Sequence, residues 1–221
     1  MKTTATYIQN NIKLIALLVL LGVSGLTFWI WRSYQQKQEG IASNAMFQAI
    51  YQFEAGNYDK ALQGEDEYAG LVDITQQYKG TKASDLAHLY TGICYLQQAN
   101  YEQAISYLER YKTSDATLQA RAISLIGDAY VEQGLHEKGL KYYLQAAKNQ
   151  HNEAYAPIYW IKAAGVYEFQ ESYQEAIRCY EILLKDYPTS RLQPEAKKQL
   201  YRLQEKIQHV EQGKTTDQTI N

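Results

Sequence analysis

The chain has 221 residues, a formal net charge of −2 and a pI of about 6.1. This balance lacks the basic stripe of a nucleic-acid-binding protein. Its two cysteines, Cys94 and Cys179, lie 85 residues apart, which favours two buried thiols over a disulfide. With only three prolines and no alternation of β-branched residues, the chain is predicted to be nearly all helix.

An uncharged run of 18 residues, LIALLVLLGVSGLTFWIW, occupies positions 14–31. As a helix it would span about 27 Å, close to the hydrocarbon thickness of a bilayer. Its aromatic end, with Phe28, Trp29 and Trp31, suits a lipid–water interface and fits a signal-peptidase site poorly. A cleaved signal peptide and a buried core helix are the alternatives. We predict a transmembrane anchor, preceded by a short tail at 1–13.

Charges next to the anchor are nearly balanced and leave its orientation open. Lys2, Lys13 and the amino terminus flank one side, whereas Arg32 and Lys37 flank the other and are offset by Glu39. Because the N-terminal tail is short, an orientation with this tail inside and the C-terminal domain outside is favoured.

A spacing pattern recurs beyond the anchor and accounts for many of the 21 tyrosines. A small residue is followed by a tyrosine three positions later, a ring six further on and a small residue three after that. Three stretches share this pattern: LAHLYTGICYLQQANYEQAISYLERY, ARAISLIGDAYVEQGLHEKGLKYYLQAAK and IYWIKAAGVYEFQESYQEAIRCYEILLKDYP. A fainter copy lies in FQAIYQFEAGNYDKALQ, and the four frames are separated by 43, 35 and 37 residues.

This spacing indicates helical hairpins that stack on each other. A small residue lets two helices approach closely, and an aromatic ring on the same face fills the adjacent space. The pattern resembles the tetratricopeptide repeat, which has a period of about 34 residues. We interpret most tyrosines as packing residues. The long first interval implies an insertion of about nine residues within GEDEYAGLVDITQQYKGT that extends a helix or forms a loop.

The predicted fold is therefore all-α: an N-terminal transmembrane helix, an α-solenoid of about four hairpins, and a C-terminal capping helix. The solenoid domain should span 32–210, and a polar, disordered tail should follow at 211–221. The expected repeats and cap helix lie at about 42–80, 85–116, 120–153, 157–190 and 192–210.

No motif for catalysis is present, so a non-enzymatic protein is predicted. The four histidines lie in separate segments, and neither a nucleophile elbow nor a phosphate-binding loop occurs. Cys94 has no histidine beside it in sequence, and Glu65, Asp66 and Glu67 indicate a solvated face and not a calcium loop. We expect no catalytic residue, cofactor, metal, small-molecule substrate or nucleic acid.

The first helices of the hairpins are expected to form a concave, partly apolar groove for an extended or helical segment of a partner. Counting along the repeat frame places nine residues of interest in it: Met46, Ile50, Phe53, Leu86, Leu89, Ile93, Leu96, Arg121 and Asp128. The same frame adds Ser124, Ile158, Ile161 and Phe169. The alternative is that these residues pack on the insertion or the cap helix.

The anchor ending FWIWRSYQQKQ, the segment ASNAMFQAIYQFEAGNYDKAL directly after it, and a divergent first repeat carry a family resemblance. Together they resemble the ancillary SecYEG translocon subunits, which are membrane-anchored periplasmic tetratricopeptide-repeat proteins of bacteria. The resemblance implies a single-pass inner-membrane protein with a periplasmic domain. It also implies contact with the SecYEG channel, periplasmic chaperones and unfolded client segments. The segment YPTSRLQPEAKKQL resembles repeat proteins of outer-membrane assembly, so a scaffold for envelope assembly is the alternative function.

Overall fold

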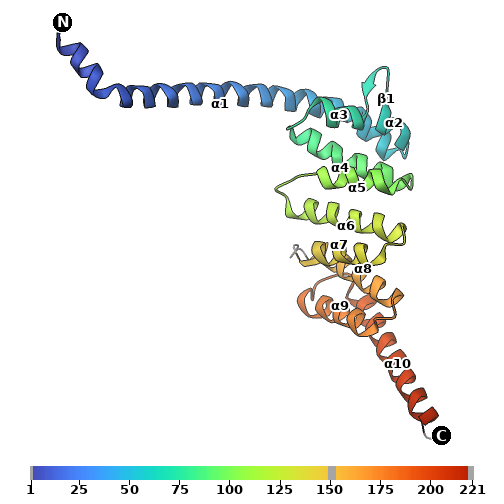
Figure 1. Cartoon of the computed structure of the whole chain (residues 1–221). Coiled ribbons are helices and arrows are strands. Elements are labelled where there is room, and N and C mark those ends of the chain that lie inside the picture. Colours follow the sequence, from blue (N-terminus) through green and yellow to red (C-terminus); the bar gives the residue numbers. More distant parts are fainter. Residues whose placement is uncertain (1, 149–152, 219–221) are drawn as a thin grey trace.

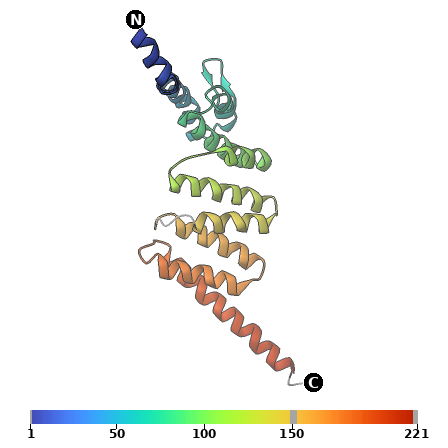
Figure 2. The same ribbon diagram turned by 60° about the vertical axis from the view of Figure 1, so that its left-hand side comes forward.

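The computed structural model describes residues 2–148 and 153–218, and it is a stack of helical hairpins with a long helix at each end. The hairpins follow one another in chain order, and α1 and α10 extend from opposite ends of the stack (Figure 2). The predicted all-α solenoid is confirmed. Its helices and its one small sheet are α1 (Lys2–Glu54), α2 (Tyr58–Gln63), β1 (Gly64–Glu65), β2 (Tyr68–Ala69), α3 (Leu71–Gln77), α4 (Lys82–Gln97), α5 (Tyr101–Arg110), α6 (Ala116–Glu132), α7 (His136–Lys148), α8 (Ala156–Phe169), α9 (Tyr173–Asp186) and α10 (Gln193–Gln218).

Helix α1 is continuous over 53 residues and includes both the predicted anchor and the first helix of the first hairpin. It begins at Lys2, so residues 2–13 of the segment that we expected to be a separate tail are helical. An 18-residue window within the described part of α1 has a mean hydropathy of 1.5, and none of it is buried. Leu20 is 67% exposed and Trp29 is 66% exposed. Because this stretch packs against nothing in the chain, it is not the core helix that was one alternative.

The solenoid begins directly after this exposed stretch. The carboxylate of Glu39 accepts hydrogen bonds from the backbone N–H groups of Lys82 (2.6 Å) and Ala83 (2.9 Å) at the start of α4. Two unpaired donors at a helix N-terminus favour such a negative side chain. Three residues further, Ala42 is fully buried, and Met46 and Ala49 follow on the same face. Helix α1 is thus fixed to the domain with no linker between them.

The second helix of the first hairpin is interrupted by a β-hairpin, whereas we expected the insertion to extend a helix or form a loop. Strands β1 and β2 pair antiparallel, and α2 and α3 flank them. The two ends of the insertion meet at Gly64 and Gly70: a Cβ on Gly70 would lie 2.2 Å from the Leu62 carbonyl oxygen. Gly64 also has a φ of 74°, which favours glycine. The β-hairpin therefore leaves and rejoins the helical layer at one point.

Close approach within each hairpin takes place at the small residues of the repeat. A Cβ on Gly127 would lie 2.7 Å from the Tyr143 ring, and one on Gly139 would lie 2.9 Å from the Gly127 carbonyl oxygen. The equivalent Gly92 packs on Leu108, where a Cβ would lie 2.5 Å from Cγ. Helices α6 and α7 therefore touch backbone to backbone, as the spacing pattern predicts.

The four turns within the hairpins have the same geometry. Each places one residue at positive φ: Gly56 (77°), Ala99 (56°), Gly134 (74°) and Glu171 (57°). The next backbone N–H then reaches back five residues, the 6→1 bond of a Schellman motif, as in Asn100 to the Tyr95 oxygen at 2.8 Å. This shared helix ending makes successive hairpins alike even where their sequences differ.

The C-terminal helix α10 covers the last hairpin. Ala196, Leu200 and Leu203 on its inner face are buried in the same core cluster as α8 and α9. The helix continues to Gln218, past the end predicted near residue 210, so most of the segment expected to be a disordered tail is helical. Residues 219–221 lie outside the described part of the chain, as do residues 149–152 near the predicted end of the third repeat.

Both cysteines are free and buried. Burial raises the pKa of Cys94 and of Cys179 from 9.0 to about 12. At pH 8 only about one thiol in ten thousand would be the reactive thiolate in the folded chain. We expect alkylation by iodoacetamide to be slow in the native state, to accelerate as the pH rises towards 12, and to become fast in urea. Mass spectrometry of timed samples measures the rate of alkylation, and equal rates with and without urea would contradict the burial of the two thiols.

Candidate protein-binding face on the first helices

The first helices of successive hairpins meet on one face of the stack: α4 contacts the end of α1 and α6, and side chains of α8 reach α6 and α10. Their shared face is where the repeat frame placed the groove. Its two halves differ in packing, because the apolar residues predominate in the first two repeats and the polar ones in the last two.

In the first half, most of the apolar residues pack against one another. Met46, Leu89 and Ile93 are 3%, 3% and 8% exposed. Ile50, Phe53, Leu86 and Leu96 are half-buried and pack against the same two clusters. The prediction of an open groove at these residues is therefore wrong for Met46, Leu89 and Ile93. Packing on the insertion or the cap helix was the alternative. Met46 does share a cluster with Leu71 and Ile74 of the insertion, whereas Leu89 and Ile93 pack on α5 and α6 and not on the cap helix.

The reason lies in the size of these side chains. The rings of Phe53 and Tyr90 meet edge to face at 4.9 Å. Leu89 and Ile93 belong to one cluster with Leu108 of α5 and Ile126 of α6. Long side chains at the frame positions of neighbouring helices reach each other and exclude water. A charge at Leu89 would therefore unfold this layer, so Leu89→Glu does not test partner binding.

In the second half, the predicted residues carry charges that connect one hairpin to the next. Arg121 is exposed, and Asp128 is half-buried. Lys162 of α8 pairs with Asp128 at 2.7 Å to both carboxylate oxygens, and it lies 3.3 Å from the Ser124 hydroxyl. The Tyr143 hydroxyl of α7 donates to the same carboxylate at 2.7 Å. Burial and the nearby Asp128 raise the pKa of Tyr143, so it remains a hydrogen-bond donor.

The next repeat has the same arrangement. The Tyr180 hydroxyl of α9 donates to Glu168 of α8 at 2.8 Å, and Arg202 of α10 pairs with Glu168. In both repeats a tyrosine on the second helix, an acid on the first helix and a cation on the following helix form one chain of charge-assisted bonds. These two chains fix the angle between successive hairpins. Sequence reasoning named Asp128 but missed Lys162, because the pairing joins residues 34 apart.

An open apolar hollow of about 240 Å³ lies beside this ion pair. Its walls come from α6, the start of α7 and α8: Val131, His136, Tyr143, Lys162, Gly165, Val166 and Phe169. Phe169 is 69% exposed and its ring centre lies 4.3 Å from that of His136. A Cβ on Gly165 would have no atom within 4 Å of it, so this glycine keeps the hollow open. Ile158, 38% exposed, continues the face along α8.

The hollow combines apolar rings with a cation and a carboxylate that satisfy each other. Such a surface is suited to holding an apolar side chain of a partner, with the polar rim aligning its backbone. Of the predicted groove residues, the structure leaves Arg121, Ile158 and Phe169 accessible. The open part of the face therefore lies on the third and fourth repeats.

Comparison with known families agrees with this architecture. Residues 124–191 match one model of the tetratricopeptide repeat, and residues 86–116 match another. These segments therefore carry tetratricopeptide repeats, whose general role is to bind proteins. The first repeat and both terminal helices lie outside the matches. No curated protein matches the chain in sequence.

Solved structures of repeat proteins are similar to the chain in fold. A putative kinesin light chain of Podosopora anserina with nearly identical TPR-like repeats has a TM-score of 0.55 and 14% identity, covering 84% of this chain and 92% of that one. A chain of the APC/C hetero-tetramer Cut9–Hcn1 has a TM-score of 0.52 and 16% identity over 72% of this chain. The match spans only 29% of that longer chain. At these identities the similarity shows the solenoid fold.

The Asp128–Lys162 pair should stabilise the contact between the third and fourth repeats. Lys162→Met leaves a half-buried carboxylate with Tyr143 as its remaining partner, and we expect a loss of about 1–2 kcal/mol. In a double-mutant cycle with Asp128→Asn, urea unfolding should show a coupling of about 1 kcal/mol. The exposed pair Arg178–Glu175 is the matched control, with an expected coupling below about 0.5 kcal/mol. Equal coupling in the two pairs would contradict the structural role of Lys162.

Proposed function

We propose that the chain is a non-enzymatic protein-binding scaffold tethered to a membrane by residues 14–31. The observation that carries this proposal is the continuity of α1: its fully exposed apolar stretch runs without a linker into a tetratricopeptide-repeat solenoid. Exposed leucines and tryptophans over about 27 Å of helix need an apolar surrounding, and a bilayer supplies one of the right thickness.

Within that class, we infer a place at the bacterial Sec translocon. The residues that follow the anchor resemble the ancillary SecYEG translocon subunits, a resemblance that implies a cytoplasmic amino terminus. The solenoid would then lie in the periplasm, in contact with the SecYEG channel and periplasmic chaperones. The hollow beside Phe169 fits an apolar side chain of an unfolded client segment, which would assist secreted or envelope proteins as they emerge.

Photo-crosslinking in a bacterial host tests both the face and the partners. A photoreactive amino acid replaces Phe169, 69% exposed, and in a second strain Phe47 of α1, 70% exposed, serves as a control of equal exposure away from the hollow. We expect the Phe169 probe to crosslink SecYEG subunits and secretory clients, and the yield to fall when translation is stopped. The Phe47 probe should crosslink them much less.

The outcomes separate the candidates. Crosslinks from Phe169 to envelope-assembly proteins, unchanged when secretion stops, would support a scaffold for outer-membrane or other complex assembly instead. Equal yields from the two probes would contradict a binding site on the face of α8. A second variant, Phe169→Ala, tests the same contact without the probe and should weaken client capture while leaving the thermal midpoint unchanged, because its ring is mostly exposed.

A further inference from the structure

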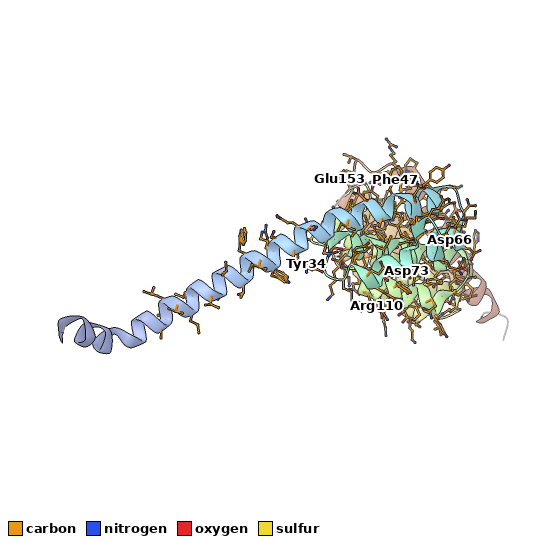
Figure 3. The ribbon with its side chains drawn as sticks, turned by 90° about the horizontal axis from the view of Figure 1, so that it is seen from above. Tyr34, Phe47, Asp66, Asp73, Arg110 and Glu153 are labelled. Carbon is orange, nitrogen blue, oxygen red and sulfur yellow. The ribbon has the colours of Figure 1, made fainter. Side chains whose placement is uncertain are left out.

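The rigid connection between anchor and solenoid also determines which side of the domain lies nearest the membrane. Helix α1 runs crosswise to the stack, roughly along the helices of the hairpins (Figure 1). The connections from one hairpin to the next lie on the side towards the apolar part of α1, and the turns within hairpins lie on the opposite side. Seen from above, Tyr34 and Glu153 lie towards the anchor and Asp66 lies far from it (Figure 3). We call these sides the near edge and the far edge.

The near edge lies within electrostatic range of lipid headgroups if residues 14–31 span the bilayer. Glu39, which bonds the start of α4, follows Trp31 by eight residues, or about 12 Å of helix. The headgroup layer of one leaflet takes up roughly 6 Å of that distance. The remaining gap of about 6 Å is shorter than the screening length of about 8 Å at physiological salt.

The near edge of the first two hairpins exposes cations. Lys79 and Lys82 at the α3–α4 connection, and Arg110 and Lys112 at the α5–α6 connection, are all exposed. None of the four takes part in an ion pair among the described residues. Lys37 is exposed on the adjacent part of α1. On the last two hairpins, Glu153 and Asp186 offset two of the three cations Lys148, Lys185 and Arg191.

Of the carboxylates on the same edge, Glu109 beside Arg110 is exposed, and three others are bonded to helix N-termini or half-buried. Glu39 is bonded to the N-terminus of α4. Asp115 accepts from the backbone N–H groups of Thr117 (2.8 Å) and Leu118 (3.1 Å) at the N-terminus of α6. Asp85 is half-buried between the two connections, where burial raises its pKa. The positive ends of the helices thus offset the negative charge of the bonded acids, whereas the charge of the exposed lysines is not offset in this way.

A hollow of about 670 Å³ opens between these two connections. Lys82, Lys112, Thr113 and Ser114 lie on its walls, together with Asp85 and apolar residues of α4 and α6. Two ammonium groups and two hydroxyls in an open hollow suit phosphate oxygens, which accept hydrogen bonds from both kinds of group.

The far edge has the opposite charge. The tip of the β-hairpin carries Glu65, Asp66 and Glu67, all exposed, and Glu132 and Glu171 follow at the turns of later hairpins. A negative lipid surface would attract the near edge and repel the far edge. Both forces turn the near edge towards the membrane, which is the orientation that α1 imposes on the domain.

We propose that the near edge of the first two hairpins lies against anionic lipid headgroups, with Lys79, Lys82, Arg110 and Lys112 as the contact. The proposal rests on the membrane tethering proposed above. It lays the solenoid along the bilayer, with the face of α4, α6 and α8 directed sideways over the membrane surface. A segment leaving a neighbouring channel would then meet the near-edge end of this face first, and the hollow beside Phe169 lies at its far-edge end.

Energy transfer in vesicles tests the contact with the full chain. A donor is attached to Ser114→Cys on the near edge or to Asp66→Cys on the far edge, and headgroup-labelled lipid is the acceptor. The native thiols are buried with a pKa of about 12, so the label goes to the introduced cysteine. Vesicles of phosphatidylcholine alone are compared with vesicles that also contain phosphatidylglycerol. We expect transfer from position 114 to rise with the anionic lipid and to lose that rise at 1 M salt, where the screening length is about 3 Å.

Charge reversal supplies the matched control. Lys82→Glu with Lys112→Glu should abolish the rise, whereas Lys138→Glu with Lys141→Glu, the same change in charge away from the near edge, should leave it intact. If energy transfer from position 114 does not depend on lipid charge while the chain still co-floats with the vesicles, the proposed contact is wrong but the membrane anchor is supported. If the chain floats with neither vesicle type, the tether itself is wrong. Equal transfer from positions 66 and 114 would contradict the orientation of the domain.

Discussion

Two arginines in the apolar stretch of α1, Leu20→Arg with Val23→Arg, are expected to move the chain from the membrane fraction to the soluble fraction. Eleven strongly apolar residues in the run contribute about −3 to −7 kcal/mol to insertion, and each central arginine opposes it by about 2.5–3.5 kcal/mol. Because two apolar residues are lost as well, the free energy of insertion rises to about zero or above. Membrane pelleting after alkaline carbonate extraction measures the result.

The solenoid should survive that change, because Leu20 and Val23 are 67% and 57% exposed and contact no other part of the domain. Circular dichroism of the soluble variant should therefore show a helical protein with a cooperative thermal transition. Leu20→Ile with Val23→Leu is the conservative control and should remain in the membrane. An arginine variant that resists carbonate extraction would contradict insertion of this helix.

The substitution Gly139→Val is expected to cause a large loss of stability in the solenoid. Its Cβ would lie 2.4 Å from a methyl carbon of Val131 and 2.9 Å from the Gly127 carbonyl oxygen. Backbone cannot move aside as a flexible side chain can, so helices α6 and α7 must separate. Overpacking of this kind costs about 3 kcal/mol, which lowers the melting temperature of a domain of this size by about 6–12 °C.

Gly165→Ala is the matched control, since it is also a glycine inside a helix but has no atom within 4 Å of the added Cβ. Alanine is the better helix former, and we expect a gain of about 0.5–1 kcal/mol. Thermal melts of both variants measure the difference. A melting temperature for Gly139→Val within one degree or so of the parent would mean that α6 and α7 do not touch at this point.

The repeat architecture could be predicted because its cause is local. The small residue and the aromatic three positions later lie on one face of one helix, so their spacing survives in the sequence. Gly92 and Gly127 are the small residues of this pattern, and each meets the following helix, at Leu108 and Tyr143 respectively. The positive φ of Ala99 and of Glu171 left no such signal, because neither residue is the glycine that this conformation favours.

The binding face was harder to predict, because frame position alone does not say whether a side chain is covered. Leu89 and Phe169 both occupy first-helix positions on the predicted face. Leu89 meets leucine and isoleucine from its neighbours and is buried, whereas Phe169 stands next to Gly165 and remains exposed. The composition of adjacent repeats decides this outcome. The β-hairpin was missed for a similar reason, because Gly64 and Gly70 close it through a contact in space.

The most direct test of a membrane-tethered scaffold is the location of its solenoid, measured with a dual reporter fused after Asn221 in a bacterial host. One half of the reporter is active only in the periplasm and the other only in the cytoplasm. We predict a periplasmic signal from a membrane-bound fusion, which places the α8 face where translocated segments emerge. A cytoplasmic signal would contradict a role on the exit side of the Sec channel.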